Sequence, residues 1–386
     1  MCVFINFTIT AMLYLKTKIT NKIVKSLLLG SMLLLSTTMA ACLTACQSAP
    51  QASDDFQKPA ENRKFQRPIV IAHRGASGYL PEHTLEAYIR GMELGADFIE
   101  PDLVMTKDGV LVARHENEIS ETTNVADVFP KRKTTKTVDD VKMAGWFVED
   151  FTLAEIKKLK AKQRLAFRPQ MDQQPFLIPT LDEIIDAVDQ YNTKTGKSIG
   201  IVPEIKHSSY FRSIGVNMEK ALLKALEDKK WDKKLDQVYI QSFEVSNLKE
   251  LATLSKYHLV QLLGDPAESP YDLKGKKTYA DMVTLDGLKE IRKYAQVLGP
   301  YKKYLVVENA KSEMTLVAND VLKNAKLLEL KIIPYTFRNE SFFVMKPLTD
   351  PVKEYEFFYK IGVDGVFSDF PDTAVKALKM GNETIN

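Results

Sequence analysis

The sequence predicts an α/β fold in which eight parallel strands and the helices that follow them form a (β/α)8 TIM barrel. Short apolar segments rich in β-branched residues alternate with helix-like segments along the chain. The chain has 386 residues, of which 45% are hydrophobic and 27% charged, which is enough to bury one large core. A doubly wound open sheet is the competing architecture, but no glycine-rich phosphate loop follows the first predicted strand.

Nine segments are predicted to be strands, one more than the barrel needs. They cover residues 69–73, 98–105, 110–115, 199–205, 237–242, 259–263, 295–298, 332–337 and 365–368. Only residues 106–109 separate the second segment from the third, whereas a parallel crossover needs about a dozen residues or more. These two segments are therefore expected to form an antiparallel hairpin, with Asp108 and Gly109 in its turn. The other eight form the barrel, and an insertion of about residues 106–197 is expected to cap it between barrel strands 2 and 3.

The first 46 residues have the features of an export signal. Positively charged residues precede an apolar run at positions 27–35, which is too short to span a bilayer comfortably. Leu43-Thr44-Ala45-Cys46 follows this run and resembles the lipobox of bacterial lipoproteins, whose cysteine becomes the lipidated first residue of the mature protein. The alternatives are an ordinary cleaved signal and a poorer lipidation site at Cys42.

The predicted organisation thus has three parts. Residues 1–46 are a lipoprotein signal peptide with Cys46 as the lipidated residue, and residues 47–67 are a polar, flexible tether. Residues 68–386 form the barrel. We expect an exported protein, held in the periplasm or at the outer membrane by its lipid anchor.

Charge and cysteine content limit the possible partners and sources of stability. The four lysines of the first 46 residues account for more than the net charge of +3, so the rest of the chain carries a charge of −1. A domain so close to neutral has no electrostatic footprint for nucleic acid, and no nucleic-acid partner is expected. Because Cys2, Cys42 and Cys46 are the only cysteines, the barrel can form no disulfide of its own.

Residues with catalytic chemistry stand at the ends of the first two barrel strands. In a barrel, residues at the carboxyl ends of strands face the mouth where chemistry occurs. His73 and Arg74 end the first strand, and together they can combine proton transfer with a fixed cation for a phosphate. Glu100 and Asp102 lie two residues apart on the second strand, so they share a face.

The third barrel strand repeats this spacing with Glu204 and Lys206. Three carboxylates from two neighbouring strands form an oxygen-rich site that suits Ca²⁺ or Mg²⁺, and the barrel offers no cysteine for a zinc site. The alternative is an ion-pair network in which Arg74 and Lys206 neutralise the carboxylates without a metal.

The hairpin is expected to add His115 to this group. A two- or four-residue turn places His115 opposite Asp102 or Glu100, and cross-strand partners share a face. Two histidines, two cations and a hard metal suit hydrolysis of a phosphodiester, because one imidazole can take a proton from the nucleophile while the other protonates the leaving alkoxide.

Segments in order from residue 69 to about 372 resemble the glycerophosphodiester phosphodiesterase family, and the long insertion resembles its exported bacterial subgroup. The longest likeness opens with His73-Arg74-Gly75 and runs to Glu86, and others lie at residues 100–109, 203–206, 241–243, 335–338 and 362–369. The resemblance implies a (β/α)8 barrel that hydrolyses glycerophosphodiesters, such as glycerophosphocholine and glycerophosphoethanolamine, to glycerol 3-phosphate and an alcohol.

The resemblance also implies roles for individual residues. His73 and His115 would form the acid and base pair, and Arg74 and Lys206 would contact the phosphate. A divalent cation, usually Ca²⁺ in the exported subgroup, would bind to Glu100, Asp102 and Glu204. The aromatic residues Phe243 and Tyr335 would surround the glycerol, although core packing is the alternative for Phe243.

Two positions depart from the family pattern, and two rival functions stay open. Glu116 stands where many members have Asp, and His83 where the broad family often has Asn, so neither is given a role; nor are His207 and His258. One rival is a phospholipase of the same barrel group that acts on intact lipids. The other is a surface lipoprotein whose main role is to bind a partner.

Overall fold

The computed structural model describes residues 67–171, 174–309 and 315–383. The predicted signal peptide, the lipidation site at Cys46 and the tether up to residue 66 lie outside the described residues. None of the described helices is both long enough and apolar enough to cross a membrane.

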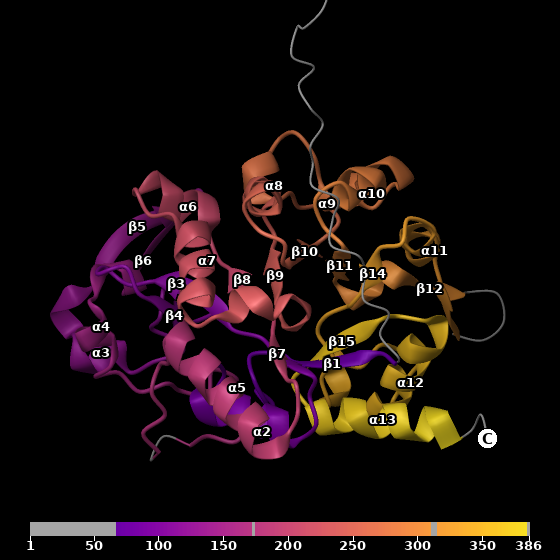
Figure 1. Cartoon of the computed structure of the whole chain (residues 1–386), viewed down its shortest axis with the longest axis horizontal. Coiled ribbons are helices and arrows are strands. Elements are labelled where there is room, and N and C mark those ends of the chain that lie inside the picture. The colour runs from indigo at the N-terminus through magenta and orange to yellow at the C-terminus, as the bar shows by residue number, and fades with distance from the viewer. Residues whose placement is uncertain (1–66, 172–173, 310–314, 384–386) are drawn as a thin grey trace, which may run out of the picture. The chain divides into compact units, whose positions relative to one another are not determined.

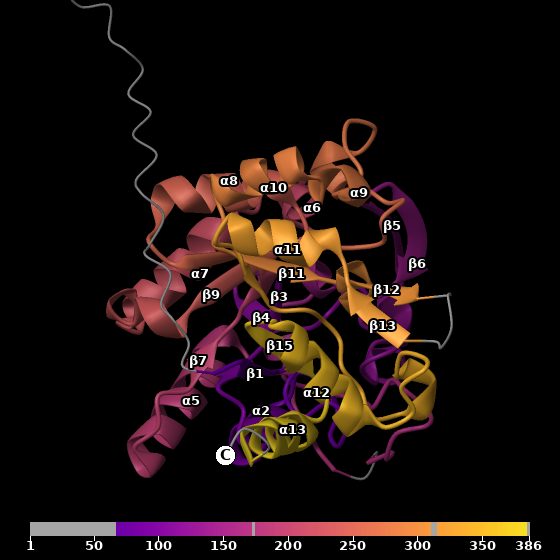
Figure 2. The same ribbon diagram turned by 90° about the vertical axis from the view of Figure 1, so that its right-hand side faces the viewer.

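Eight parallel strand positions form a closed barrel, as the sequence predicts (Figures 1 and 2). Two of the eight are interrupted, so that each comprises two short strands. The strands are β1 (Ile69–Ala72), β2 (Phe98–Ile99) with β3 (Asp102–Met105), β7 (Gly200–Ile201) with β8 (Glu204–Ile205), β9 (Tyr239–Ser242), β10 (His258–Leu263), β11 (Val297–Pro300), β14 (Lys331–Ile332) and β15 (Gly365–Ser368).

Backbone hydrogen bonds close the barrel between its last two strand positions. β15 pairs with β1 on one side. On the other side Asp364 N–H donates to the Ile332 carbonyl over 2.8 Å, and Phe367 N–H donates to the Pro334 carbonyl over 3.0 Å. The sheet therefore has no free edge along the barrel wall, and the open-sheet alternative is excluded.

Alternate residues of the strands pack on opposite sides of the barrel wall. Ile69 and Ile71 of β1 belong to a small apolar cluster inside the barrel with Phe98 and Phe367, whereas Val70 packs in the larger cluster between strands and helices. Both faces of each strand are buried, which explains why the strands appear in the sequence as continuous apolar runs.

Helices follow the strands and cover the outside of the barrel. Several begin with a threonine or asparagine whose side chain accepts a backbone N–H of the first turn, as Thr180 does from Glu183. The helices are α2 (Leu85–Glu93), α5 (Leu181–Thr195), α6 (Ser208–Ser213), α7 (Met218–Asp228), α8 (Val245–Leu254), α9 (Tyr279–Met282), α10 (Leu285–Arg292), α11 (Asp320–Leu327), α12 (Pro351–Ile361) and α13 (Pro371–Glu383).

The longest inserted segment lies between β3 and α5. It contains three strands, two of which form a hairpin, and two one-turn helices, and these elements gather at one side of the barrel in Figure 1. Its elements are β4 (Leu111–Ala113), α3 (Val125–Val128), β5 (Thr134–Val138), β6 (Val141–Gly145) and α4 (Leu153–Ile156). Helix α5 falls within the predicted insertion but packs beside α2 as a barrel helix. That the segment caps the mouth stays a prediction.

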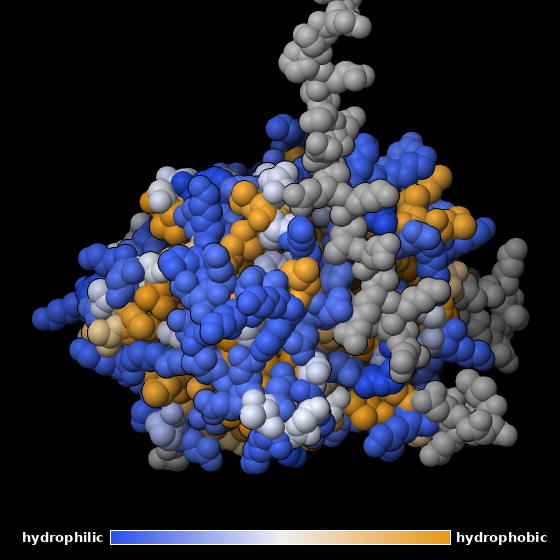
Figure 3. Space-filling model, viewed as in Figure 1, coloured by the Kyte–Doolittle hydropathy of each residue, from blue (hydrophilic) through white to orange (hydrophobic). Residues whose placement is uncertain are grey.

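Short 3-10 helices and one further hairpin complete the chain. The hairpin, formed by β12 (Val306–Asn309) and β13 (Thr315–Ala318), precedes α11. The 3-10 helices are Pro130–Arg132, Val148–Asp150, Trp231–Lys233, Leu235–Gln237, Tyr271–Leu273, Lys302–Leu305 and Ser341–Phe343. The face of the molecule seen in Figure 3 is mainly hydrophilic, with its hydrophobic residues in scattered patches.

β3 and β4 are antiparallel, as predicted, but the predicted hairpin register is wrong. Met105 pairs with Leu111 and Leu103 with Ala113, so five residues rather than two or four form the turn. This register places Arg114, not His115, beside Asp102, and Arg114 N–H donates to the Asp102 carbonyl over 2.9 Å. β4 ends at Ala113, so His115 lies beyond the strand. The alternation of side chains between the two faces of a strand therefore does not determine the direction of the His115 side chain.

Candidate active site

The predicted catalytic and binding residues gather at the carboxyl ends of the barrel strands. A cavity of about 170 Å³ opens there, and seven of the nine predicted residues of the barrel line it. The cavity is lined by His73, Arg74, Glu100, His115, Glu204, Phe243, Leu262, Tyr335, Thr336, Arg338 and Phe367. The other two, Asp102 and Lys206, contact lining residues: Asp102 lies 3.4 Å from Arg74 and Lys206 lies 3.0 Å from Glu204.

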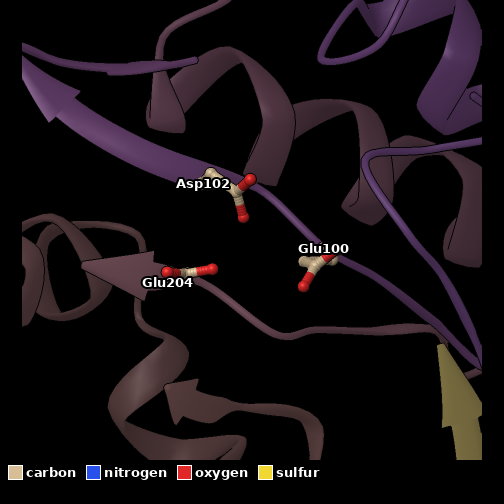
Figure 4. A group of neighbouring side chains, drawn as sticks. All are labelled: Glu100, Asp102 and Glu204. Carbon is tan, nitrogen blue, oxygen red and sulfur yellow. The ribbon is translucent and has the colours of Figure 1, made fainter. Parts of the chain in front are cut away.

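Glu100, Asp102 and Glu204 form the three-carboxylate cluster that the sequence predicts. Each offers one oxygen, and these oxygens lie within 4.8 Å of one another. The carboxylates project from neighbouring strands toward a common space (Figure 4). Asp102 and Glu204 are direct partners in the ladder between β3 and β8.

The electrostatics of this cluster fit a bound cation. Burial and the charge of Asp102 raise the pKa of Glu100 well above its usual range, and burial raises that of Glu204 to about 7. The Oδ1 atom of Asp102 is buried and has no hydrogen-bond partner among the described residues. Three clustered carboxylates with an unpaired buried oxygen are the ligand chemistry that Ca²⁺ and Mg²⁺ prefer. The residues therefore fit a hard divalent cation.

Neighbouring side chains hold the carboxylates in place. Gln241 donates to Glu100 over 2.6 Å, and the backbone N–H of Arg74 donates to the same carboxylate over 3.1 Å. Arg74 and Gly75 both have left-handed backbone conformations, with φ of 59° and 86°, which turns the chain sharply after β1. His83 bonds Asp102 through Nε2 over 3.0 Å and Tyr88 through Nδ1 over 2.7 Å.

His73 is held by Asp369, which follows the last barrel strand. His73 Nδ1 lies 2.5 Å from a carboxylate oxygen of Asp369. Although burial opposes ionisation, His73, Arg338 and Arg168 keep the pKa of Asp369 well below its usual range. This carboxylate is therefore ionised and can only accept hydrogen bonds. Burial and Arg74 lower the pKa of His73 to about 4. The imidazole is thus neutral at pH 7, with its proton on Nδ1, and its Nε2 lies 3.7 Å from Glu100.

His115, which also lines the cavity, has a similar arrangement. Its Nδ1 lies 2.8 Å from Glu116, and its Nε2 lies 3.4 Å from the Lys206 ammonium. Burial, Arg74 and Lys206 lower the pKa of His115 to about 3, while 31% of its side chain stays exposed. Both histidines therefore keep Nε2 free of a proton, on the side of the cavity.

Arg74 and Lys206 supply positive charge beside the carboxylates. Arg74 contacts Glu82 over 3.3 Å as well as Asp102. Although burial favours the neutral amine, Glu204 raises the pKa of Lys206, which stays charged. Both cations are paired with carboxylates, and Arg74 also lines the cavity, where an anionic ligand can contact it.

Phe243 and Tyr335 form an aromatic wall of the cavity. Their rings meet edge to face, with centroids 6.1 Å apart. Tyr335 donates its hydroxyl hydrogen to the Leu263 carbonyl over 2.7 Å, so its ring presents an apolar face. Phe243 is only partly buried, and it borders the cavity as well as packing against the core.

Several residues of the site were not assigned from the sequence. Asp369 and Arg338 both follow strands of the barrel, and the rule that singled out His73 would have found them. Arg168 has no such signal: it reaches Asp369 from the inserted segment, 201 positions away in the chain, over 2.5 Å. Glu116 links His115 to His207, which it contacts over 3.0 Å.

Comparison with known proteins identifies relatives of the chain. The model of the glycerophosphoryl diester phosphodiesterase family matches residues 73–373. A glycerophosphodiester phosphodiesterase of Arabidopsis thaliana is 36% identical over 360 residues, which cover 88% of this chain and 93% of the relative. One of Haemophilus influenzae is 32% identical over 366 residues, covering 89% of this chain and 98% of the relative.

Solved structures share the fold at lower sequence identity. A phosphodiesterase of Oleispira antarctica, in complex with the product sn-glycerol-3-phosphate, has a TM-score of 0.53 and 20% identity and covers 81% of this chain and 97% of that one. A glycerophosphodiester phosphodiesterase of Agrobacterium tumefaciens has a TM-score of 0.53 and 16% identity, with 80% of this chain and 99% of that one covered.

Proposed function

Because this chain belongs to the glycerophosphoryl diester phosphodiesterase family and is a glycerophosphodiester phosphodiesterase, we propose that its hydrolysis of glycerophosphodiesters to glycerol 3-phosphate and an alcohol depends on a divalent cation. The observation that carries this proposal is the cluster of Glu100, Asp102 and Glu204 beside two neutral histidines and two cationic side chains.

A divalent cation held by the three carboxylates would polarise a phosphoryl oxygen and offset its growing negative charge. The side chains around it have complementary tasks. Arg74 and Lys206 hold the phosphate through their positive charge. The phosphate would then lie between His73 and His115, and the Phe243 and Tyr335 rings would pack against the glycerol carbons.

The two histidines supply the proton transfers. Each has an unprotonated Nε2 that can accept the proton of an attacking hydroxyl, and an imidazole protonated in this way can return the proton to a leaving alkoxide. Asp369 and Glu116 fix the proton on Nδ1 of His73 and His115, and they stabilise the imidazolium that forms. Positioned groups of this kind contribute roughly 10²- to 10⁴-fold each.

The proposal also includes the identity of the cation and the location of the enzyme in the cell. Three carboxylate ligands suit Ca²⁺ or Mg²⁺, and we propose Ca²⁺ first because of the resemblance to the exported subgroup, which usually binds Ca²⁺. Leu43-Thr44-Ala45-Cys46 supports an exported, lipid-anchored enzyme of the periplasm or outer membrane, as in the exported bacterial subgroup. The product in the Oleispira antarctica complex supports glycerol 3-phosphate as the product here.

A glycerol 3-phosphate release assay tests the proposal. Protein that starts near Gln47 is assayed on glycerophosphocholine before and after treatment with a chelator, and then with Ca²⁺ or Mg²⁺ restored. We expect chelation to abolish turnover and one of the two cations to restore it. Full turnover by metal-stripped protein would refute the metal dependence. Parallel assays with intact phospholipid test the phospholipase alternative, and absence of turnover on every diester would leave the binding-lipoprotein alternative.

A further inference from the structure

A second cavity adjoins the active-site cavity, and we call it the headgroup cavity. It has a volume of about 200 Å³ and shares Glu204 and Phe243 with the active-site cavity. Lys206 also lines it, at the boundary between the two. A phosphodiester carries two organic groups on one phosphorus, so two cavities that meet at the phosphate-binding residues match such a substrate. If the glycerol group occupies the active-site cavity, the headgroup cavity can accommodate the alcohol.

Aromatic side chains form one wall of the headgroup cavity. Phe243, Tyr271 and Tyr279 line it, and the rings of Phe243 and Tyr279 meet edge to face with centroids 6.3 Å apart. Tyr279 is only 4% exposed, yet its hydroxyl group forms no hydrogen bond with any residue that the structure describes. Tyr279 lines the cavity, so this unpaired hydroxyl is available to a ligand there.

Carboxylates also line the headgroup cavity. Glu244 is 5% exposed and accepts hydrogen bonds from Ser209, while Asp139 accepts from His207 Nδ1 over 2.6 Å. The second oxygen of Asp139 is buried without a partner in the described part of the chain, as is one oxygen of Asp272, whose other oxygen accepts from Val245 N–H.

Among the side chains that line this cavity, the carboxylates of Asp139, Glu204 and Glu244 outnumber the cations of Lys206 and His207. Burial raises the pKa of Glu244, and repulsion from Asp272 and Asp139 raises it further, against the bonds from Ser209. The cations that line the cavity are already paired: Lys206 contacts Glu204, and His207 contacts Asp139 and Glu116. No side chain with an unpaired positive charge lines the cavity within the described ranges.

We propose that the headgroup cavity binds the leaving alcohol and selects substrates whose alcohol carries an ammonium group, quaternary as in choline or primary as in ethanolamine. This inference rests on the proposed function. An ammonium group is attracted to the faces and hydroxyls of the tyrosines and to Glu244. It would act as a positively charged partner for the excess carboxylates of the cavity.

The test compares kcat/KM for glycerophosphocholine and glycerophosphoethanolamine with that for glycerophosphoglycerol, whose leaving alcohol is neutral. Glu244→Gln removes the charge at nearly constant shape and keeps an acceptor for Ser209. We expect the ratio of ammonium to neutral kcat/KM to fall roughly tenfold, the scale of one desolvated cation contact. Glu268→Gln is the matched control, because this exposed glutamate, in the segment after β10, does not line the cavity, and its ratio should stay at the wild-type value.

Tyr279→Phe is a second variant, which distinguishes the two ammonium groups. A primary ammonium can donate to the Tyr279 hydroxyl oxygen and a quaternary one cannot, so we expect a loss with glycerophosphoethanolamine that exceeds the loss with glycerophosphocholine. An unchanged ammonium-to-neutral ratio in both variants would overturn the inference while leaving the proposed function intact. Absence of glycerol 3-phosphate release by the wild type from all three diesters would instead overturn the proposed function.

Discussion

Replacing Asp369 with asparagine tests how the protein keeps His73 ready to accept a proton. One oxygen of Asp369 bonds His73 Nδ1 over 2.5 Å, while the other accepts from Arg168 over 2.5 Å and from Arg338 over 2.9 Å. Arginine nitrogens only donate, so the amide oxygen of the variant must face the two arginines. Its NH2 group then faces Nδ1, which must accept. The proton of His73 therefore moves to Nε2, and this nitrogen can no longer accept a proton from the attacking hydroxyl.

The expected loss follows from the loss of one proton-transfer group. We expect kcat to fall by a factor on the order of 10² to 10⁴, with KM little changed, because Arg74 and Lys206 still hold the phosphate. The fold should persist, since Arg168 keeps its contact with Glu340 over 2.7 Å. The assay is glycerol 3-phosphate release at saturating substrate.

Asp372→Asn is the matched control for this variant. Asp372 lies near Asp369 in the chain and accepts a hydrogen bond from Tyr79 over 2.8 Å, away from the active-site cavity. Its kcat should equal that of the wild type. Near-normal kcat for Asp369→Asn would refute the reasoning about the proton of His73, whereas an equal loss in both variants would indicate a general effect on folding.

Four other predictions test other parts of the structure. His73→Ala and His115→Ala should each lower kcat by about 10² to 10⁴, and the double variant should lose much less than the product, because the two residues act as a unit. Glu204→Gln should reproduce the effect of chelation, since it removes a ligand charge at nearly constant shape. His207 has its pKa raised to about 9, because its bonds to Asp139 and Glu116 outweigh burial. Its charge therefore stabilises the fold fully below pH 6.5, by on the order of 3 kcal/mol relative to His207→Asn, and urea unfolding should show this advantage vanish as pH rises through about 9. Cys46→Ser should abolish lipidation, which the intact mass of the mature protein reports.

Each of these predictions has a contrary outcome. Near-normal turnover by both alanine variants would remove the histidines from catalysis, and wild-type turnover by Glu204→Gln would remove that residue from the metal site. A constant difference in unfolding free energy from pH 6 to pH 10 would show that the His207 charge is not responsible. A wild-type mass without lipid would refute the anchor.

Much of the fold and of the site could be predicted because it depends on local sequence and on one topological rule. Barrel strands are buried on both faces, so they stand out as apolar runs between helices. The carboxyl ends of these strands meet at one mouth, and the structure therefore brings His73, Glu100 and Glu204 together from segments far apart in the chain. The same rule applied to the last strand would have included Asp369.

What escaped prediction depends on contacts between distant segments. The turn after β3 has five residues because Thr106 bonds both the Asp108 carboxylate and Val110 N–H, while Asp108 also accepts from Leu153 N–H, 45 positions away. A local turn rule does not include that last contact. The headgroup cavity is similar, because Asp139 comes from the inserted segment and Tyr279 from the helix after β10.

Two prolines connect the strand pattern to the proposed metal site. Pro101 and Pro203 fall where the second and third barrel strands are interrupted, and a proline cannot donate to a sheet ladder. The ladder resumes with Asp102 directly opposite Glu204, in spite of the cost of placing like charges side by side. A sheet built for stability alone would place uncharged or oppositely charged partners there. The interruption lets Glu100 join from before the proline, so the same local backbone that weakens the sheet assembles the three carboxylates on which the proposed cation binding depends.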